Sequence, residues 1–130
     1  EKKIRQNLNT AKYSLVDCGN KHLCIKIRSV SNYKLEDLYK KLQPEISTKK
    51  INLSIYKKTK GEIQIRTYEN GAGETLSCGS ASASVASIEL NEKGKAKIFS
   101  SGGKLQFLQY KDKLKMIGPA INVYKGVIEE

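Results

Sequence analysis

Residues 68–84 read YENGAGETLSCGSASAS, and this stretch sets the architecture that we expect for the rest of the chain. Just before it, residues 62–68 (EIQIRTY) alternate polar and apolar side chains, which predicts a β-strand. A loop containing Gly71 and Gly73 then leads to Cys78, which begins a run built almost wholly from Gly, Ser and Ala. We interpret this run as a helix, so the sequence predicts a cysteine at a helix N-terminus.

A cysteine in that position has favourable surroundings for ionisation. The unpaired backbone N–H groups at a helix N-terminus and the helix dipole stabilise negative charge, so a thiolate forms more easily there. A thiolate can act as a nucleophile or a base, and the neighbouring N–H groups can hold a carboxylate. Position alone leaves a buried, inert cysteine as the alternative for Cys78.

The same stretch resembles the second catalytic-cysteine motif of the diaminopimelate epimerase family, Tyr/Trp-Glu-Arg-Gly-x-Gly-Glu-Thr-x-x-Cys-Gly-Ser/Thr-Gly. The family residues that this chain keeps are Glu69, Gly71, Gly73, Glu74, Thr75, Cys78, Gly79 and Ser80. It departs from the pattern at Asn70, where the family has arginine, and at Ala81, where the family usually has glycine.

Four further segments resemble the family in the family's order, matching its Gly-Asn-Pro-His, Val-Asn, Pro-Gly-Gly-x-Leu and Met-x-Gly-Pro-Ala. They are Gly19-Asn20-Lys21-His22, Ile51-Asn52, Ser101-Gly102-Gly103-Lys104-Leu105 and Met116-Ile117-Gly118-Pro119-Ala120. The resemblance falls on the C-terminal half of enzymes that are about two such domains long. We find no counterpart here of the N-terminal half, which carries its own Cys-Gly-Asn-Gly motif. We therefore expect residues 1–130 to be one domain, resembling that C-terminal half.

The family inverts an α-carbon without a cofactor, using two cysteines on opposite faces of the substrate. One thiolate removes the α-proton and the other thiol returns a proton from behind. The resemblance implies that Cys78 is one of these thiols and that the N–H groups of Gly79 and Ser80 hold the α-carboxylate. It further implies that Glu69 binds the ammonium group, that Asn20 and Asn52 bind the far end of a diaminopimelate-like substrate, and that His22 neighbours the thiols.

Structural roles remain open for several of these residues. Asn20 follows a glycine and suits a turn, Asn52 suits an edge strand, and a lone His22 is more often structural than catalytic. Cys18 precedes Gly-Asn as the family's N-terminal cysteine does. However, a strand-like run that includes Cys24 follows it where a helix should begin, so we predict that both are ordinary strand residues.

Asn70 leaves the substrate open. The family's arginine grips the distal carboxylate in a forked contact, which the shorter, neutral asparagine cannot replace. Three explanations follow: the substrate lacks that carboxylate, a lysine such as Lys21 supplies the charge, or the site has decayed. Lys21 stands where the family has proline, so the two departures are a candidate compensating pair.

The formal charge of +11 raises the question of a polyanionic partner. Arginine occurs only at positions 5, 28 and 66, and the lysines are spread along the chain, which favours a solvated basic surface over a nucleic-acid interface. The three cysteines and one histidine lack metal-site spacing, so we expect no metal. Reduced thiols and the lack of a signal peptide or membrane-spanning run predict a cytoplasmic protein.

The expected fold class is α+β, with a strongly curved, mostly antiparallel sheet wrapped around a central small-residue helix at residues 78–90. A second helix is predicted at 34–42, capped by Ser31 or Asn32 and stopped by Pro44. The predicted strands are 13–17, 23–30, 51–57, 62–68, 96–100, 105–110, 114–117 and 121–128, and residues 1–11 read as a linker or an edge strand.

The resemblance thus implies an isomerase that interconverts LL- and meso-diaminopimelate for lysine and peptidoglycan precursor synthesis. Its partners would be an amino-acid substrate and an N-terminal domain that carries the second cysteine, and a homodimer is a possible assembly. Two alternatives stay open: a racemase for another amino acid, and a non-catalytic basic domain that binds a polyanion.

Overall fold

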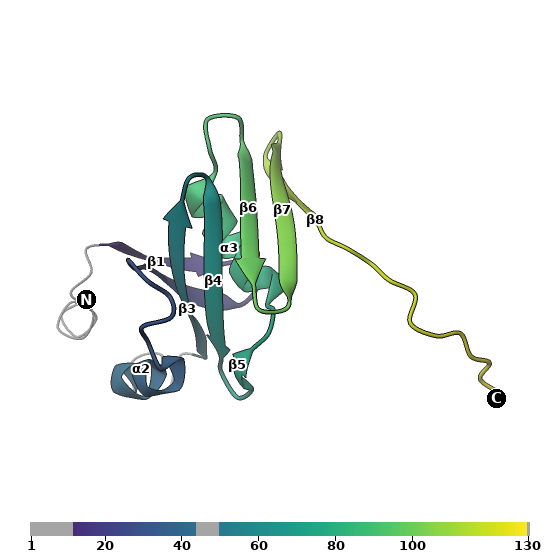
Figure 1. The fold of residues 1–130 in the computed structure, drawn as a ribbon, viewed down its shortest axis with the longest axis horizontal. Coiled ribbons are helices and arrows are strands. Elements are labelled where there is room, and N and C mark those ends of the chain that lie inside the picture. Colours follow the sequence, from purple (N-terminus) through teal and green to yellow (C-terminus); the bar gives the residue numbers. More distant parts are fainter. Residues whose placement is uncertain (1–11, 44–49, 130) are drawn as a thin grey trace.

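A computed structural model describes residues 12–43 and 50–129, shown in Figure 1. The strands are β1 (Lys12–Asp17), β2 (Lys21–Lys26), β3 (Ile51–Thr59), β4 (Glu62–Glu69), β5 (Gly73–Thr75), β6 (Lys95–Ser100), β7 (Gly103–Tyr110) and β8 (Lys113–Ile117), and the helices are α2 (Leu35–Leu42) and α3 (Gly79–Glu89). In the described part of the chain, neither helix has the length or the apolar sequence needed to cross a bilayer.

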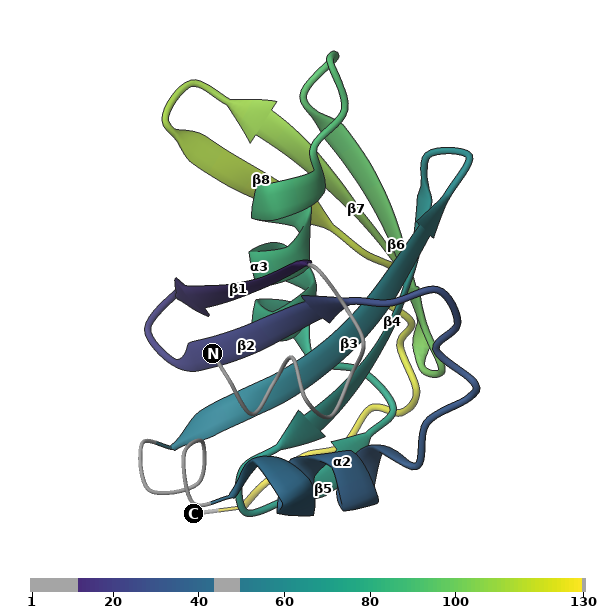
Figure 2. The same ribbon diagram turned by 90° about the vertical axis from the view of Figure 1, so that its left-hand side faces the viewer.

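All eight strands join one sheet in the order β1-β2-β3-β4-β6-β7-β8, with β5 paired to β4. Five of the seven pairings are antiparallel. The two parallel pairs, β2–β3 and β4–β6, need crossover connections, which α2 and α3 supply. The sheet curls strongly around α3 (Figure 2), so the predicted α+β class and the curved, mostly antiparallel sheet around a central helix are confirmed.

Helix α3 contacts β2, β3, β6, β7 and β8. Its inward residues are small: Ala81, Ser84 and Ala86 are buried together with Val85. Short side chains let the strands approach the helix axis closely, which explains why a Gly/Ser/Ala run forms an enclosed helix rather than a linker. On this face of the sheet, α3 and the strands share a hydrophobic cluster of buried residues, which are Cys24, Tyr56, Ile63, Ile65, Ala81, Val85, Ala86, Ala96, Ile98 and Phe107.

The other face of the sheet is covered by α2. Its apolar stripe of Leu35, Leu38, Tyr39 and Leu42 packs with residues of β2 and β3. Because helices cover both faces, residues 51–56 of β3 are all buried, as is usual for a strand at the centre of a two-sided core.

Three predictions about the ends and caps of these elements, or about a whole strand, are wrong in the described residues. The second strand ends at Lys26 rather than at residue 30. Ser31 and Asn32 do not cap helix α2: its N-cap is Lys34, and the side chains of Ser31 and Asn32 bond within their own loop. Residues 121–128 form no strand, and their apolar side chains are exposed without a neighbouring strand. Pro44 and residues 1–11 lie outside the described residues.

The C-terminal end of α3 is tied to the sheet by the Glu89 carboxylate, whose side chain is only 12% exposed. Lys26 Nζ donates to it at 2.8 Å and Tyr56 Oη at 3.0 Å, while Lys58 Nζ lies 3.2 Å from the second oxygen. Burial raises the pKa of Glu89, but the hydrogen bonds from these three residues outweigh it and hold that pKa below its ordinary value. The two lysines also offset the unfavourable negative charge at a helix C-terminus.

We predict that Glu89→Ala lowers the free energy of unfolding by about 1–3 kcal/mol, because it leaves Tyr56 and two lysines without their shared acceptor. Urea denaturation followed by circular dichroism measures this. Glu36→Ala is the matched control, since the exposed Glu36–Lys40 pair is screened by water and its loss has a much smaller effect. Equal destabilisation by the two substitutions would contradict the prediction.

Candidate active site

Cys78 caps the N-terminus of α3 with an extended backbone, φ −137° and ψ 111°, and is half-buried. Gly71 and Gly73 have φ of +85° and +88°, a conformation that other residues adopt with strain, so they shape the loop that leads to the cysteine. Gly102 also holds this segment: its N–H donates to the Leu76 carbonyl at 2.7 Å. A Cβ at Gly102 would lie 3.0 Å from that carbonyl oxygen, so a larger residue would push the two segments apart.

Four of the predicted site residues meet at the first turn of α3. Ser80 Oγ lies 3.4 Å from Cys78 Sγ, 3.2 Å from Asn20 Nδ2 and 3.0 Å from His22 Nε2. Asn20 and His22 come from the β1–β2 turn and the start of β2, about 60 residues earlier in the chain. We call Asn20, His22, Cys78 and Ser80 the Ser80 cluster.

His22 is fully buried within this cluster. Burial lowers its pKa below the ordinary value, and the nearby charge of Glu69 opposes this only partly. Its Nδ1 atom has no hydrogen-bond partner among the described residues. His22 is therefore neutral at neutral pH.

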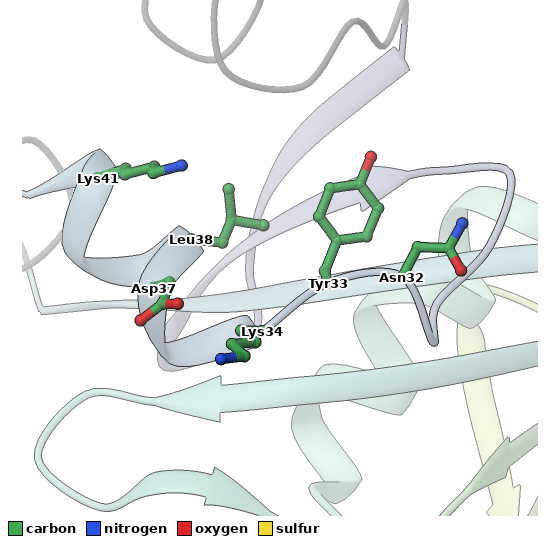
Figure 3. A pocket seen from close by; sticks show the side chains of 6 residues that line it. All are labelled: Asn32, Tyr33, Lys34, Asp37, Leu38 and Lys41. Carbon is green, nitrogen blue, oxygen red and sulfur yellow. The ribbon is translucent and has the colours of Figure 1, made fainter.

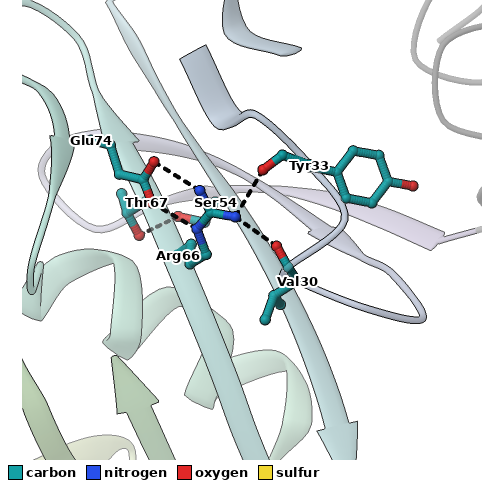
Figure 4. Close-up of polar contacts among 6 residues, drawn as sticks. All are labelled: Val30, Tyr33, Ser54, Arg66, Thr67 and Glu74. Carbon is teal, nitrogen blue, oxygen red and sulfur yellow. Dashed lines mark hydrogen bonds and ion pairs between the residues drawn. The ribbon is translucent and has the colours of Figure 1, made fainter. Parts of the chain in front are cut away.

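Glu69 lies at the end of β4, where its carboxylate accepts a hydrogen bond of 2.6 Å from Thr75 Oγ1 on β5. The glycine loop is anchored beside it by Arg66, whose guanidinium binds both carboxylate oxygens of Glu74 at 2.7 and 2.9 Å. Figure 4 shows that the same guanidinium also donates to the backbone carbonyls of Val30 and Tyr33. A forked, charge-assisted contact of this kind fixes the loop that carries Glu69 and leads to the cysteine.

Asn52 and Asn70 form a second group with Tyr39. The Asn70 N–H donates to Asn52 Oδ1 at 2.8 Å, and Asn70 Nδ2 donates to the Tyr39 hydroxyl at 2.6 Å. Tyr39 in turn stacks on Tyr68 with 4.3 Å between ring centroids. The Asn70 side chain is thus hydrogen-bonded to a residue of α2. Asn52 of β3 lies opposite His22 of β2 in the strand pairing.

Lys21, the proposed compensating residue, begins β2 and is exposed. None of the described hydrogen bonds or ion pairs joins Lys21 to Asn70 or to the Ser80 cluster. The structure therefore adds no contact in support of compensation, and the hypothesis stays a prediction.

Cys18 was predicted to be an ordinary strand residue, and this prediction is wrong. It lies in the turn after β1 rather than in a strand, and its Sγ is 3.7 Å from the Ser80 carbonyl oxygen and 3.4 Å from Ser84 Oγ. The signal was its place two residues before Asn20, which brings it to the same helical turn. Cys24, in contrast, is a buried strand residue as predicted, and burial raises its pKa to about 12.

Two cavities in the described structure lie away from these residues. One of about 260 Å³, shown in Figure 3, is lined by one side of α2, from Asp37 to Lys41, and by the loop before the helix. The other, of about 360 Å³, is lined by residues of β1, β2, β3 and the end of α3. Neither of these two cavities is lined by a predicted site residue. No group of three metal-ligating His, Cys, Asp or Glu side chains is present among the described residues.

Solved structures share this arrangement of sheet and helices. A phenazine biosynthesis protein of the PhzF family from Enterococcus faecalis superposes with a TM-score of 0.62 at 15% identity, covering 78% of this chain and 41% of that one. A phenazine biosynthesis PhzC/PhzF protein from Clostridium difficile gives 0.59 at 21% identity, covering 84% and 44%. The class is therefore the α+β proteins of diaminopimelate epimerase/PhzF-like fold.

The sequence places the chain within that class. The profile of diaminopimelate epimerase matches residues 14–126, and the chain belongs to the diaminopimelate epimerase family. The diaminopimelate epimerase of Buchnera aphidicola subsp. Baizongia pistaciae is 38% identical over 88% of this chain and 42% of its own length. That of Methanocella arvoryzae is 31% identical over 97% and 47%. The chain thus spans less than half the length of these relatives, which are isomerases.

The buried, neutral state of His22 predicts a pH dependence of stability. Its pKa is lowered in the folded chain from about 6.5, so below that pH the unfolded chain binds the proton first and stability falls as the pH falls. We expect the melting temperature to drop between about pH 7.5 and 5.5, and to drop less in His22→Gln, which has no titrating ring. Thermal melts followed by circular dichroism test this, and an identical pH slope in the two proteins would rule out His22 as the cause.

Proposed function

We propose that this chain is the C-terminal domain of a cofactor-independent, two-cysteine amino-acid epimerase, with Cys78 as one of the two acid/base thiols. The observation that carries the proposal is the convergence of Cys78, Asn20, His22 and Ser80 at the N-terminus of α3. Diaminopimelate is the substrate named for the relatives, and interconversion of its LL and meso forms is the proposed reaction. A cytoplasmic role in lysine and peptidoglycan precursor synthesis follows from that substrate.

Each residue has a definite part in this chemistry. The N–H groups of Gly79 and Ser80 receive the α-carboxylate, since they lie in the first helical turn, where such groups lack intrahelical acceptors. The Cys78 thiolate takes the α-proton, so that the C–H bond breaks and an S–H bond forms. Glu69, adjacent to the glycine loop, binds the ammonium group, and Asn52 binds the distal end of the substrate.

The second thiol of the proposed pair would lie outside residues 1–130. This chain covers 42–47% of the relatives' length, and its site residues line neither of its described cavities. An N-terminal domain that closes over α3 would supply both the second cysteine and the exclusion of water. By itself the chain would have little or no epimerase activity.

A related racemase for another amino acid is the nearest alternative, and Asn70 favours it. The Asn70 amide is engaged by the Tyr39 hydroxyl, and it offers no charge to a distal carboxylate. Lys21→Ala tests whether Lys21 compensates for the charge that Asn70 lacks. If it does, the affinity for diaminopimelate falls in this variant. Unchanged affinity would leave Lys21 without that role.

The alternative of a polyanion-binding domain rests only on the formal charge of +11. Such binding would weaken steeply with salt and would ignore alkylation of the thiols. Binding of an amino-acid substrate at α3 would be abolished by alkylation of Cys78. Binding assays with native and alkylated chain therefore separate the two functions.

The experiment for the proposed function follows exchange of the substrate α-proton in heavy water by NMR. The chain is mixed with the N-terminal half of the Buchnera aphidicola enzyme and offered diaminopimelate and a panel of other amino acids. We expect exchange that Cys78→Ala lowers by about 10²–10⁴-fold, the contribution typical of an acid/base group. The matched control is Cys24→Ala, which removes a buried thiol outside the site and keeps exchange.

Exchange that survives in Cys78→Ala would contradict the role of this thiol. Exchange of a panel member other than diaminopimelate would replace the substrate and keep the mechanism. Absence of exchange with every amino acid, in a mixture shown by sedimentation to have assembled, would contradict the epimerase proposal.

A further inference from the structure

The hydroxyl group of Ser80 is the centre of the Ser80 cluster, and its hydrogen bonds can be assigned one by one. A serine hydroxyl has one proton to donate and two lone pairs that accept. The amide nitrogen of Asn20 can only donate, and it lies 3.2 Å from Ser80 Oγ. One lone pair of Ser80 is therefore taken by Asn20.

His22 takes the second lone pair. Its Nε2 atom lies 3.2 Å from Asn20 Oδ1, which can only accept, so Nε2 carries a proton. The same N–H lies 3.0 Å from Ser80 Oγ and is shared between the two oxygens. In the neutral ring Nδ1 is then unprotonated, which agrees with its having no hydrogen-bond partner among the described residues.

The proton of Ser80 is left for Cys78, whose Sγ lies 3.4 Å from Ser80 Oγ. A hydroxyl that donates to sulfur stabilises the thiolate over the thiol. We propose that Ser80, through its side chain, is a positioning residue whose hydroxyl donates to Cys78 Sγ and stabilises negative charge on that sulfur, in addition to any contact of its N–H with substrate.

Cys18, beside the same helical turn, has the opposite surroundings. Its Sγ lies 3.4–3.7 Å from four oxygen atoms: the carbonyl and side-chain oxygens of Asn20, the carbonyl of Ser80 and the hydroxyl of Ser84. Carbonyl oxygens only accept, and the Ser84 proton is already donated to the Ser80 carbonyl at 2.8 Å. Cys18 must therefore be the donor, and none of these four oxygens stabilises negative charge on its sulfur.

Cys78 and Cys18, which both lie beside the first turns of α3, thus have opposite hydrogen-bond surroundings: a hydroxyl donates to the sulfur of Cys78, and acceptor oxygens surround the sulfur of Cys18. Only the use of the Cys78 thiolate as a base rests on the proposed function. In that use the α-proton moves to Cys78 Sγ, while the Ser80 proton stays on its oxygen. Cys18 is a reference thiol in the same chain, since its sulfur lies 3.7 Å from the Ser80 carbonyl oxygen on the same helical turn but has acceptors around it.

Iodoacetamide alkylation of the intact chain at neutral pH, resolved by peptide mass spectrometry, tests the inference. The thiolate sulfur attacks the methylene carbon and iodide leaves, so the rate reports the thiolate fraction together with access. We expect Cys78, although half-buried, to react faster than the exposed Cys18. Buried Cys24 stays unreacted while the chain is folded. Faster reaction at Cys18 would overturn the inference, because access would then decide.

Variants of the two serines make the test specific. Ser80→Ala should slow alkylation of Cys78 by about tenfold, the effect of losing a hydrogen bond to a charged group. Ser80→Thr, which keeps the hydroxyl, should restore the fast rate, and Ser84→Ala should leave the Cys78 rate unchanged. An unchanged Cys78 rate in Ser80→Ala would overturn the inference.

Exposure of Cys24 to alkylation in Ser80→Ala would show that this variant unfolds, and Ser80→Thr then decides. A folded Ser80→Thr chain with a slow Cys78 would also overturn the proposal. Alkylation needs no substrate and no second domain, so this experiment and α-proton exchange succeed or fail independently.

Discussion

Enclosure of α3 by the curled sheet is the constraint from which the rest of the structure follows. Strands can close around a helix only if its side chains are short, and Ala81, Ser84 and Ala86 meet that requirement. Closure brings the β1–β2 turn onto the first turn of the helix, where Ser80 bonds with residues of that turn. The same small-residue composition that permits packing therefore also assembles the Ser80 cluster.

The site is held from two directions. On the loop side, Arg66 fixes the glycine loop through Glu74 and two backbone carbonyls, and Gly102 lets the β6–β7 turn rest against the segment before Cys78. On the sheet side, burial keeps His22 neutral and therefore a donor through one nitrogen only. Rigid support of this kind suits a site whose chemistry depends on the position of one sulfur atom.

Much of the fold, and part of the candidate site, could be predicted from the order of residues along the chain. The alternation of polar and apolar residues predicted β4, and the run of small residues predicted α3. The glycine loop before that run predicted that Cys78 lies at the helix N-terminus. Contacts between distant segments could not be read in the same way: Cys18 beside Ser84, or Asn70 bonded to Tyr39, depend on strand pairing and sheet curvature rather than on local pattern. The prediction of a strand at residues 121–128 was wrong, because a run of β-forming residues becomes a strand only where a neighbouring strand pairs with it.

The central claim is that the N-terminus of α3 receives the carboxylate of an amino acid beside Cys78. Backbone amide NMR of the chain, titrated with meso-diaminopimelate, tests it most directly. We predict that the largest shifts fall on the Gly79 and Ser80 amides, and that Ser82, already bonded to the Cys78 carbonyl, shifts less. Shifts confined to surface lysines, with both of those amides unmoved at saturating ligand, would contradict the claim.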